Sequence, residues 1–315
     1  MKDEFYFPSK DGNTEIHTVE WKPEGKIKAV LQICHGMVEY VNRYDKFAEF
    51  LCSQGYYVVG NDHLGHGKSI QSKKEYGYFN EKYGNACILG DMHTLRQRTM
   101  KKYPHIPYFM LGHSMGSALV RQYVQMYGNG LSGIILIGVV ADHNPAALRF
   151  ARHMCRVMAA FRGWHYRSKF MDRLTLGSYN KGYKPARTRA DWITSDNQLL
   201  DAYVDDPLCS FMFTVNAYYH MFSGMRQIQK KESFYMIPKT LPMLIAAGDE
   251  DPAGKFGKGV KKIYEKYKSA GIQDVSLRLY SGDRHELLNE TDRTQVYEDL
   301  LGWLEDKISS YQNKM

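Results

Sequence analysis

The sequence predicts an α/β fold in which a mostly parallel, doubly wound β-sheet carries an inserted helical cap. Short, nearly continuous apolar runs alternate with helical patterns in the first and last parts of the chain, as expected of strands that crossover helices bury on both faces. The alternation stops in the middle for about a hundred residues with a helical and irregular pattern. A Gly-x-Ser-x-Gly sequence at 112–116 joins a strand pattern to a helix pattern. These observations place reactive loops at the carboxyl edge of a parallel sheet.

The strands expected in this sheet are short and bounded by turn-forming residues. They span 5–7, 15–21, 29–34, 56–61, 107–111, 134–137, 243–247 and 275–280. Helical patterns lie between them at 44–54, 88–103 and 118–126. This order of elements predicts parallel strands joined by helices that cover both faces of the sheet.

The interruption divides the chain into two expected units, an α/β core at 1–138 and 239–315 and a helical cap at 139–238. The first cap helix has an apolar stripe on one side and arginines on the other. The stripe consists of Ala147, Phe150, Ala151, Met154, Val157, Met158 and Phe161, and the arginines are Arg149, Arg152 and Arg156. We interpret the stripe as packing on the rest of the cap, in preference to a surface that docks on a membrane.

The composition predicts a globular protein with a substantial core, since 43% of the 315 residues are hydrophobic. No apolar run approaches the roughly 20 residues needed to cross a bilayer, and the charged start at 1–4 lacks the apolar segment of a secretory signal. The five cysteines are an odd number without a Cys-x-x-Cys pair. A reduced, cytoplasmic location is therefore expected.

The net charge of +8, from 42 basic and 34 acidic side chains, favours anionic surfaces without naming one. The basic residues are dispersed and accompany no nucleic-acid-binding motif, so no nucleic-acid partner is expected. The glycine patterns that cradle nucleotide phosphates are absent from the sequence, and no cofactor is expected. Peripheral contact with a lipid surface and the oligomeric state stay open.

Ser114 lies at the centre of the Gly-x-Ser-x-Gly sequence. A serine hydroxyl is a poor nucleophile at neutral pH, so an enzyme exposes it on a sharp turn beside a base and amide donors. The flanking Gly112 and Gly116 make such a turn possible, because they lack β-carbons that would clash with the crossing strand and helix. Ser114 is the predicted nucleophile.

The amide donors for an oxyanion are expected from two places in the chain. The sequence Cys-His-Gly-Met-Val-Glu-Tyr at 34–40 follows the third expected strand. By position, the backbone N–H groups of Met37 and Met115 would form the oxyanion hole, the latter directly after the serine. An ordinary turn is the alternative interpretation of the first segment.

Three acidic residues compete for the role of orienting a histidine, since Asp249, Glu250 and Asp251 all follow the strand expected at 243–247. A carboxylate at the end of this strand would stabilise the imidazolium that forms during acyl transfer. We choose Asp251, which precedes a proline, and interpret Asp249 and Glu250 as a solvated turn.

His285 is the predicted base, because it lies between the last strand and the terminal helix, downstream of the serine and the acid. The terminal helix is expected to begin at Asn289 or Glu290. Its apolar side chains would pack on the core, and they are Val296, Leu300, Leu301 and Trp303.

Two further histidines, His63 and His66, lie three residues apart in a glycine-rich segment after the fourth strand. A metal site is one interpretation of this spacing. Asp62 is the one carboxylate nearby and the segment has no thiolate, so a structural loop is favoured and no metal is expected.

With these residues in place, the chain resembles the α/β-hydrolase superfamily, in its monoacylglycerol lipase and lysophospholipase-like branch, the serine aminopeptidase S33 type. The resemblance covers nearly the whole chain. Its motifs are His35-Gly36-x-x-Glu39, Asp62-His63-x-Gly65-His66-Gly67-x-Ser69, Gly112 to Gly116, Gly248-x-x-Asp251-Pro252 and Arg284-His285-Glu286, with Gly177-Ser178-Tyr179-Asn180-Lys181, Arg187-Thr188, Asp191-Trp192 and Asp206-Pro207-Leu208-Cys209 in the cap.

The resemblance implies an α/β-hydrolase fold, a triad of Ser114, Asp251 and His285, and an oxyanion hole formed by the Met37 and Met115 amides. The family commonly has His-Gly-x-Gly-Glu-His in the oxyanion segment. This chain departs from that pattern with Val38 and Tyr40, which bears on acyl glycerol specificity more than on hydrolysis.

The expected function is the cleavage of a carboxylic ester, a monoacylglycerol or a lysophospholipid-like acyl ester, through an acyl-serine intermediate. Candidate side chains for an adaptable apolar pocket are Phe211, Phe213, Tyr218, Met221 and Phe222, although packing within the cap is the slightly favoured interpretation for most of them. A proline-type aminopeptidase or amidase and a non-catalytic ligand-binding homologue are the alternatives.

Overall fold

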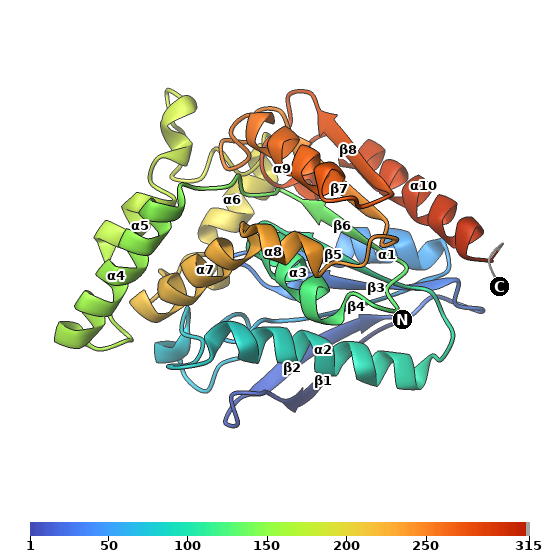
Figure 1. Ribbon diagram of the computed structural model, residues 1–315, viewed down its shortest axis with the longest axis horizontal. Helices are drawn as coiled ribbons and strands as arrows, with labels where there is room; N and C mark the ends of the chain where they lie inside the picture. The colour runs from blue at the N-terminus through green and yellow to red at the C-terminus, as the bar shows by residue number, and fades with distance from the viewer. Residues whose placement is uncertain (313–315) are drawn as a thin grey trace.

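Within residues 1–312, which the computed structural model describes, eight strands form one sheet (Figure 1). Side chains are described up to residue 309. The order across the sheet is β1-β2-β4-β3-β5-β6-β7-β8. The strands are β1 (Lys2–Pro8), β2 (Glu15–Trp21), β3 (Ala29–Cys34), β4 (Tyr56–Asn61), β5 (Tyr108–His113), β6 (Gly133–Ile137), β7 (Met243–Gly248) and β8 (Val275–Tyr280).

The predicted mostly parallel sheet is confirmed. Strands β3 to β8 run parallel to one another, whereas β2 pairs antiparallel with both β1 and β4. The carboxyl ends of β3, β5, β6, β7 and β8 therefore meet along one edge of the sheet. In an open parallel sheet this edge is where reactive loops gather.

Helices cover both faces of the sheet because alternate residues of each strand point to opposite sides. In β3, Leu31 and Ile33 pack in one core with α1 and α10, whereas Val30 and Cys34 pack in the other with α2, α3, α8 and α9. These helices are α1 (Asp45–Ser53), α2 (Gly84–Lys102), α3 (Met115–Tyr127), α8 (Lys231–Tyr235), α9 (Lys258–Ser269) and α10 (Arg293–Gln312).

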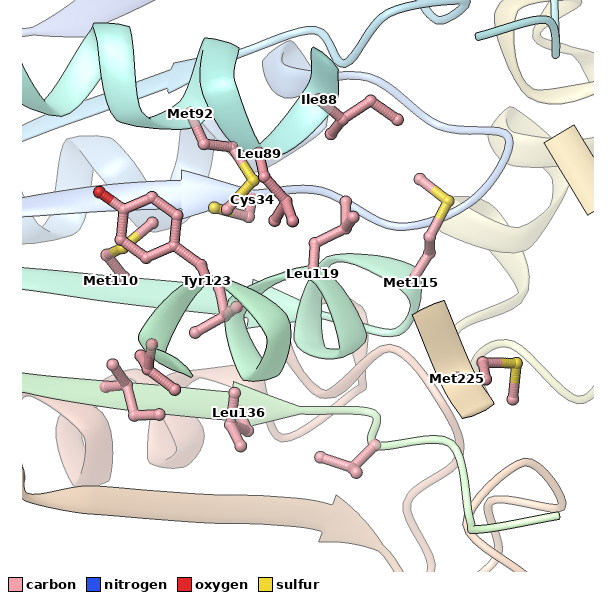
Figure 2. Close-up of a cluster of buried hydrophobic side chains, with 14 of the residues drawn as sticks. Cys34, Ile88, Leu89, Met92, Met110, Met115, Leu119, Tyr123, Leu136 and Met225 are labelled. Carbon is pink, nitrogen blue, oxygen red and sulfur yellow. The ribbon is translucent and has the colours of Figure 1, made fainter. Parts of the chain in front are cut away.

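The helix that follows Ser114 is fixed by the larger of these cores. Figure 2 shows Leu119 and Tyr123 of α3 between Met92 of α2 and Leu136 of β6. Full burial of such a side chain contributes roughly 1.5–3 kcal/mol relative to exposure. The start of α3 is therefore held in place by apolar packing along the rest of the helix.

The segment between β6 and β7 holds four further helices, with α8 at its end, and no strand in the part of the chain that the structure describes. We call residues 139–238 the insertion. It projects beyond the sheet at one side of the molecule (Figure 1), and α7 packs on both α4 and α3. The helices that come before α8 are α4 (Pro145–Arg162), α5 (Lys169–Thr175), α6 (Asn197–Asp205) and α7 (Val215–Ile228).

The orientation predicted for the first insertion helix is wrong in part. The side of α4 that is buried against α7 carries small residues, Ala151, Cys155 and Ala159, which allow the two helices to approach closely. Phe150 and Phe161, predicted to face the cap interior, are 60% and 82% exposed. Phe150 and Phe161 are thus turned to the surface, whereas Ala151, Met154 and Met158 of the predicted stripe pack on the core.

The predicted start of the terminal helix is also wrong, since α10 begins at Arg293. Asn289 ends a short 3-10 helix, and the buried Glu290 accepts hydrogen bonds from the Ser195 and Arg284 amides. These contacts hold Glu290 outside the helix. Val296 and Leu300 pack on the core as predicted.

No helix within residues 1–312 is both long and apolar enough to span a bilayer.

A close backbone crossing forms where α3 starts beside β3. A β-carbon placed on Gly116 would lie 1.9 Å from the carbonyl oxygen of Cys34, and one on Gly112 would lie 2.5 Å from the carbonyl oxygen of Gly116. Side-chain atoms do not approach backbone atoms so closely in folded proteins. Glycine is therefore required at both positions.

We expect Gly116→Ala to lower the free energy of unfolding by about 3 kcal/mol or more, because backbone must move to admit the methyl group. Gly302→Ala is the matched control in α10, where a β-carbon would meet nothing within 4 Å. It should stabilise the protein by about 0.5–1 kcal/mol. Urea unfolding followed by circular dichroism measures both changes, and equal effects would contradict the proposed crossing.

Candidate active site

Ser114 connects β5 to α3 in a strained backbone conformation. Its φ is 52° and its ψ is −114°, in the region that favours glycine. The Ser114 N–H donates to the carbonyl oxygen of Ile137 at the end of β6, at 3.0 Å. This turn places the serine side chain at the carboxyl edge of the sheet.

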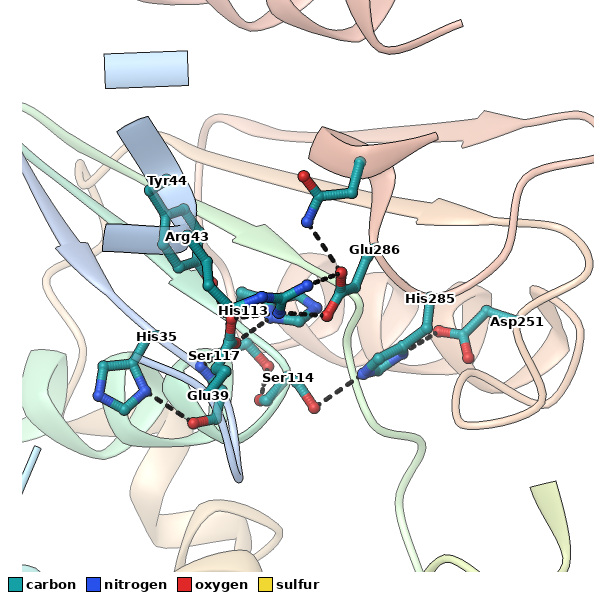
Figure 3. A network of polar contacts seen from close by, with 12 residues as sticks. His35, Glu39, Arg43, Tyr44, His113, Ser114, Ser117, Asp251, His285 and Glu286 are labelled. Atoms are coloured by element: carbon teal, nitrogen blue, oxygen red, sulfur yellow. Dashed lines mark hydrogen bonds and ion pairs between the residues drawn. The ribbon is translucent and has the colours of Figure 1, made fainter. Parts of the chain in front are cut away.

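The structure brings the three predicted triad residues together (Figure 3). His285 Nε2 lies 2.8 Å from Ser114 Oγ, and His285 Nδ1 lies 3.0 Å from Asp251 Oδ2. The second carboxylate oxygen of Asp251 accepts from the Ala253 N–H at 2.8 Å. Asp251 is fully buried, so its charge acts on the imidazole with little screening by water.

The other two acidic residues after β7 point elsewhere. Asp249 Oδ1 accepts from the Gly282 N–H at 2.8 Å, in an exposed turn. Glu250 is exposed and contributes backbone hydrogen bonds. Among the three candidates, Asp251 is the one whose carboxylate reaches His285.

The loop after β3 carries the first predicted oxyanion donor. The amide groups of Met37 and Met115 have no hydrogen-bond partner within the described residues, and both residues line the same cavity as Ser114. Between Met37 and the buried Glu39, the backbone of Val38 has a φ of 55°. Neither amide is therefore committed to a hydrogen bond within the described residues.

A buried network of charged groups lies behind Ser114 (Figure 3). His113 Nδ1 donates to Glu39 at 2.7 Å, and Arg43 donates to Glu39 at 3.0 Å. Arg43 also binds both carboxylate oxygens of Glu286, each at 2.7 Å. His113 directly precedes Ser114 and Glu286 directly follows His285 in the sequence, and Glu39 and Arg43 connect these two residues in space.

The charges in this network shift one another's ionisation. Burial alone would lower the pKa of His113, but the Glu39 carboxylate and its hydrogen bond raise it above the ordinary value. Burial opposes ionisation of Glu39, and the His113 and Arg43 charges nevertheless hold its pKa well below the usual range. Each charge has an opposite partner, as a buried charge requires.

A cavity of about 300 Å³ opens beside Ser114 and His285. Its lining is mainly apolar and comes from both the core and the insertion. Phe150, Phe170 and Leu174 line it and are also more than half exposed, so the cavity continues into an apolar surface between α4 and α5.

The residues predicted to line a pocket separate into two groups. Met221 and Phe222 of α7 line the cavity. Phe211 and Phe213 pack instead around the His66 ring, with centroids 5.5 and 5.4 Å away, and Tyr218 donates to Asp172 at 3.1 Å. Phe211 and Phe213 come before the start of α7 at Val215, in the segment that packs on His66.

His63 and His66 are buried with His35, whose ring centroid lies 4.2 Å from that of His63. Burial lowers the pKa of His66 to about 3, so its ring is neutral. Across the described part of the chain, no group of three or more His, Cys, Asp or Glu side chains is arranged to hold a metal ion.

Comparison with known proteins shows a match over residues 25–292 to the family described as serine aminopeptidase, S33. The chain belongs to this family. A monoglyceride lipase homolog of Monkeypox virus is 37% identical to it, over 94% of this chain and 96% of that protein. The monoglyceride lipase of Mus musculus is 26% identical, over 92% of this chain and 86% of that protein.

Comparison with a solved structure shows the fold of this S33 family member. A highly thermostable carboxyl esterase from Bacillus coagulans, in complex with glycerol, superposes with a TM-score of 0.90 at 28% identity, covering 98% of this chain and 99% of that chain. The predicted α/β-hydrolase fold and the resemblance to the monoacylglycerol lipase branch are confirmed.

Sequence reasoning gave no role to four charged residues of this S33 family member, namely Glu39, Arg43, His113 and Glu286. Three of them adjoin or belong to the motifs around Ser114, His285 and the oxyanion segment. The sequence signal that could have identified these residues was their charge beside a site expected to be buried, because a buried charged group requires a partner. The sequence did not indicate which residues pair, since the partners lie in loops that are far apart in the chain.

The raised pKa of His113 leads to a pH-dependent contribution to stability. The contribution is fully present below the ordinary value of 6.5 and is lost as the pH rises through the folded-state value. We expect His113→Asn, which keeps a donor to Glu39, to destabilise the protein more at about pH 5.5 than at about pH 9. Urea unfolding at the two pH values measures this difference, and an equal destabilisation at both would show that His113 is not charged in the fold.

Proposed function

We propose that this protein is a serine hydrolase that cleaves carboxylic esters with medium or long acyl chains, with monoacylglycerol- or lysophospholipid-like molecules as substrates. The observation that carries the proposal is the hydrogen-bonded series Asp251–His285–Ser114 at the wall of an apolar cavity. The relatives named as monoglyceride lipases and the carboxyl esterase support the same reaction class.

In the acylation step, Ser114 Oγ attacks the ester carbonyl carbon while His285 Nε2 takes the hydroxyl proton. The distance of 2.8 Å between these atoms is already that of a hydrogen bond. Asp251 orients the imidazole and stabilises its cationic form through Nδ1. The buried carboxylate thus makes proton transfer to His285 more favourable.

The carbonyl oxygen becomes an oxyanion when the new C–O bond forms. The Met37 and Met115 amides stabilise it, since backbone donors fixed in a water-poor site bind developing charge without reorganisation. His285 then returns its proton to the leaving alkoxide, and an acyl ester of Ser114 remains. Water activated by His285 hydrolyses that ester and regenerates the serine.

The cavity favours an uncharged acyl chain. Its lining is mainly apolar, and it opens between Phe150, Phe170 and Leu174, so the insertion acts as a cap under which the chain lies. Methionines such as Met221 adapt to chains of different length because the thioether is flexible.

An aminopeptidase must bind a free α-ammonium group, and the cavity does not favour this alternative. Among the described residues, Glu39 and Glu286 are the carboxylates in its lining, and both are ion-paired with Arg43. Neither has a free charge to offer an ammonium group. A non-catalytic ligand-binding role is disfavoured because the triad geometry is complete.

A panel of p-nitrophenyl esters of rising chain length, 1-monoacylglycerols, lysophospholipids and aminoacyl anilides tests the proposal. We expect the esters to be cleaved, with kcat/KM rising from acetate to medium-chain acyl groups as more of the apolar cavity is filled. Ser114→Ala should lower kcat by several orders of magnitude.

Ser53→Ala, an exposed serine at the end of α1, is the control for that variant and should keep the wild-type rates. Near-normal turnover by Ser114→Ala would exclude Ser114 as the nucleophile. Cleavage of the anilides alone would favour the aminopeptidase, and no turnover of any member of the panel would favour a ligand-binding role.

Asp251→Asn should lower kcat by roughly 10³- to 10⁴-fold with little change in KM, because the amide no longer stabilises the imidazolium. Asp249→Asn is the matched control, since its side-chain oxygen keeps the bond from the Gly282 amide. Steady-state kinetics with a p-nitrophenyl ester compares the two. The reverse ranking would show that Asp249 has the role assigned to Asp251.

A further inference from the structure

The loop between β3 and the 3-10 helix Val41–Tyr44 contains a strained turn next to the Met37 amide. Val38 has a φ of 55°, which β-branched residues rarely adopt. Strained residues persist only where the surrounding structure fixes them. Val38 is buried and lines the cavity, so the strain lies directly beside the proposed oxyanion hole.

Three contacts fix the ends of this turn. On one side, the Gly36 amide donates to the Glu39 carboxylate. On the other, the Val41 amide donates to Asp62 at 2.8 Å and the Tyr40 hydroxyl donates to Asp206 at 2.8 Å. Among these three, the bond between Tyr40 and Asp206 is the one that reaches the insertion.

Asp206 belongs to a well-fixed part of the insertion. Its other oxygen accepts from the Leu208 amide at 2.7 Å. The neighbouring segment is bound to the loop of His285, through the Glu286 amide to Ile193 at 2.8 Å and the Ser195 amide to Glu290 at 3.0 Å. Tyr40 therefore connects the loop that carries Met37 to a part of the insertion, residues 193–206, that is also bonded to the loop of His285.

The Tyr40 hydroxyl is suited to act as a permanent donor. Burial and the neighbouring Asp206 carboxylate raise the pKa of Tyr40, so the hydroxyl keeps its proton across the working range of an esterase. A hydrogen bond from a neutral donor to a carboxylate is among the stronger types in proteins. The contact can therefore hold a backbone conformation that costs free energy.

We propose that Tyr40 is a positioning residue whose hydrogen bond to Asp206 holds the strained turn at Val38 and thereby aims the Met37 amide at the oxyanion. Without this bond, Val38 relaxes toward a negative φ and rotates the peptide group that carries the donor. The inference rests on the proposed function, because it assigns a task in the stabilisation of the tetrahedral intermediate.

The test combines Tyr40→Phe, Val38→Gly and the double variant in one cycle. Glycine adopts a positive φ without strain, so the turn in Val38→Gly needs no external restraint. Rates with p-nitrophenyl butyrate are referred to active sites titrated with a fluorophosphonate. An octyl trifluoromethyl ketone, whose adduct carries an oxyanion, is compared with 1-decanol, which occupies the cavity and forms no oxyanion.

We expect Tyr40→Phe to lower kcat and to weaken inhibition by the ketone, each by roughly fivefold to tenfold. KM and inhibition by 1-decanol should stay within about twofold of wild type, since the apolar cavity is unchanged. In the Val38→Gly background, Tyr40→Phe should change kcat by less than about twofold. Tyr219→Phe, which removes a hydroxyl that Arg152 binds within the insertion, is the control and should keep wild-type rates.

The proposal is overturned if Tyr40→Phe keeps the wild-type kcat, if its loss is the same with glycine at position 38, or if inhibition by the ketone and by 1-decanol weakens in parallel. These three results count against the proposal when the wild-type enzyme is active and the Ser114→Ala variant is inactive. Failure of the proposed function appears instead as a wild-type protein without esterase turnover, or as a Ser114→Ala variant that retains it.

Discussion

The geometry of Ser114 depends on a steric constraint at the crossing of three elements. Strand β5 turns into α3 within contact distance of the end of β3, and the space there admits no side chain at Gly112 or Gly116. The serine between them is forced to a φ of 52°. The core packing of α3 holds this conformation, so the buried apolar side chains of the helix determine where the hydroxyl lies.

Around this turn, loops from separate strands are joined by buried charge in addition to apolar packing. Glu39 of the oxyanion loop pairs with His113, and Arg43 pairs with Glu286 beside His285. Removing one partner of such a pair leaves a buried charge without compensation, which costs about 3–5 kcal/mol. The network therefore fixes the relative positions of the loops that carry the proposed nucleophile, base and oxyanion donor.

The sequence was most informative where local chemistry decides the structure. The apolar runs predicted the strands to within a few residues, and the glycines around Ser114 predicted its turn. The order of Ser114, Asp251 and His285 predicted three side chains that the structure does bring together, although their catalytic roles remain predictions. The single Gly-x-Ser-x-Gly sequence is not specific, and the further motifs shared with the family supplied the missing specificity.

Tertiary packing decided the features that the sequence did not predict. The stripe on α4 was predicted from helical periodicity, but the contact with α7 buries Ala151 and Cys155 and leaves Phe150 exposed. Phe213 looked like a pocket residue, and its burial around His66 depends on a loop far away in the chain. Hydrophobic periodicity also could not predict that Tyr40 pairs with Asp206, which lies 166 residues further along the chain.

The insertion makes two kinds of attachment. Its stretch at 190–209 is bonded to the loops of His285 and Tyr40, whereas α4 and α5 make their hydrogen bonds to α7, through Arg152 and Tyr219 and through Asp172 and Tyr218. Mutation in α4 or α5 can therefore reshape the entrance without disturbing the machinery beneath it. Substitutions in these two helices would then change which molecules enter the cavity, while the contacts among Ser114, His285 and Asp251 stay as they are.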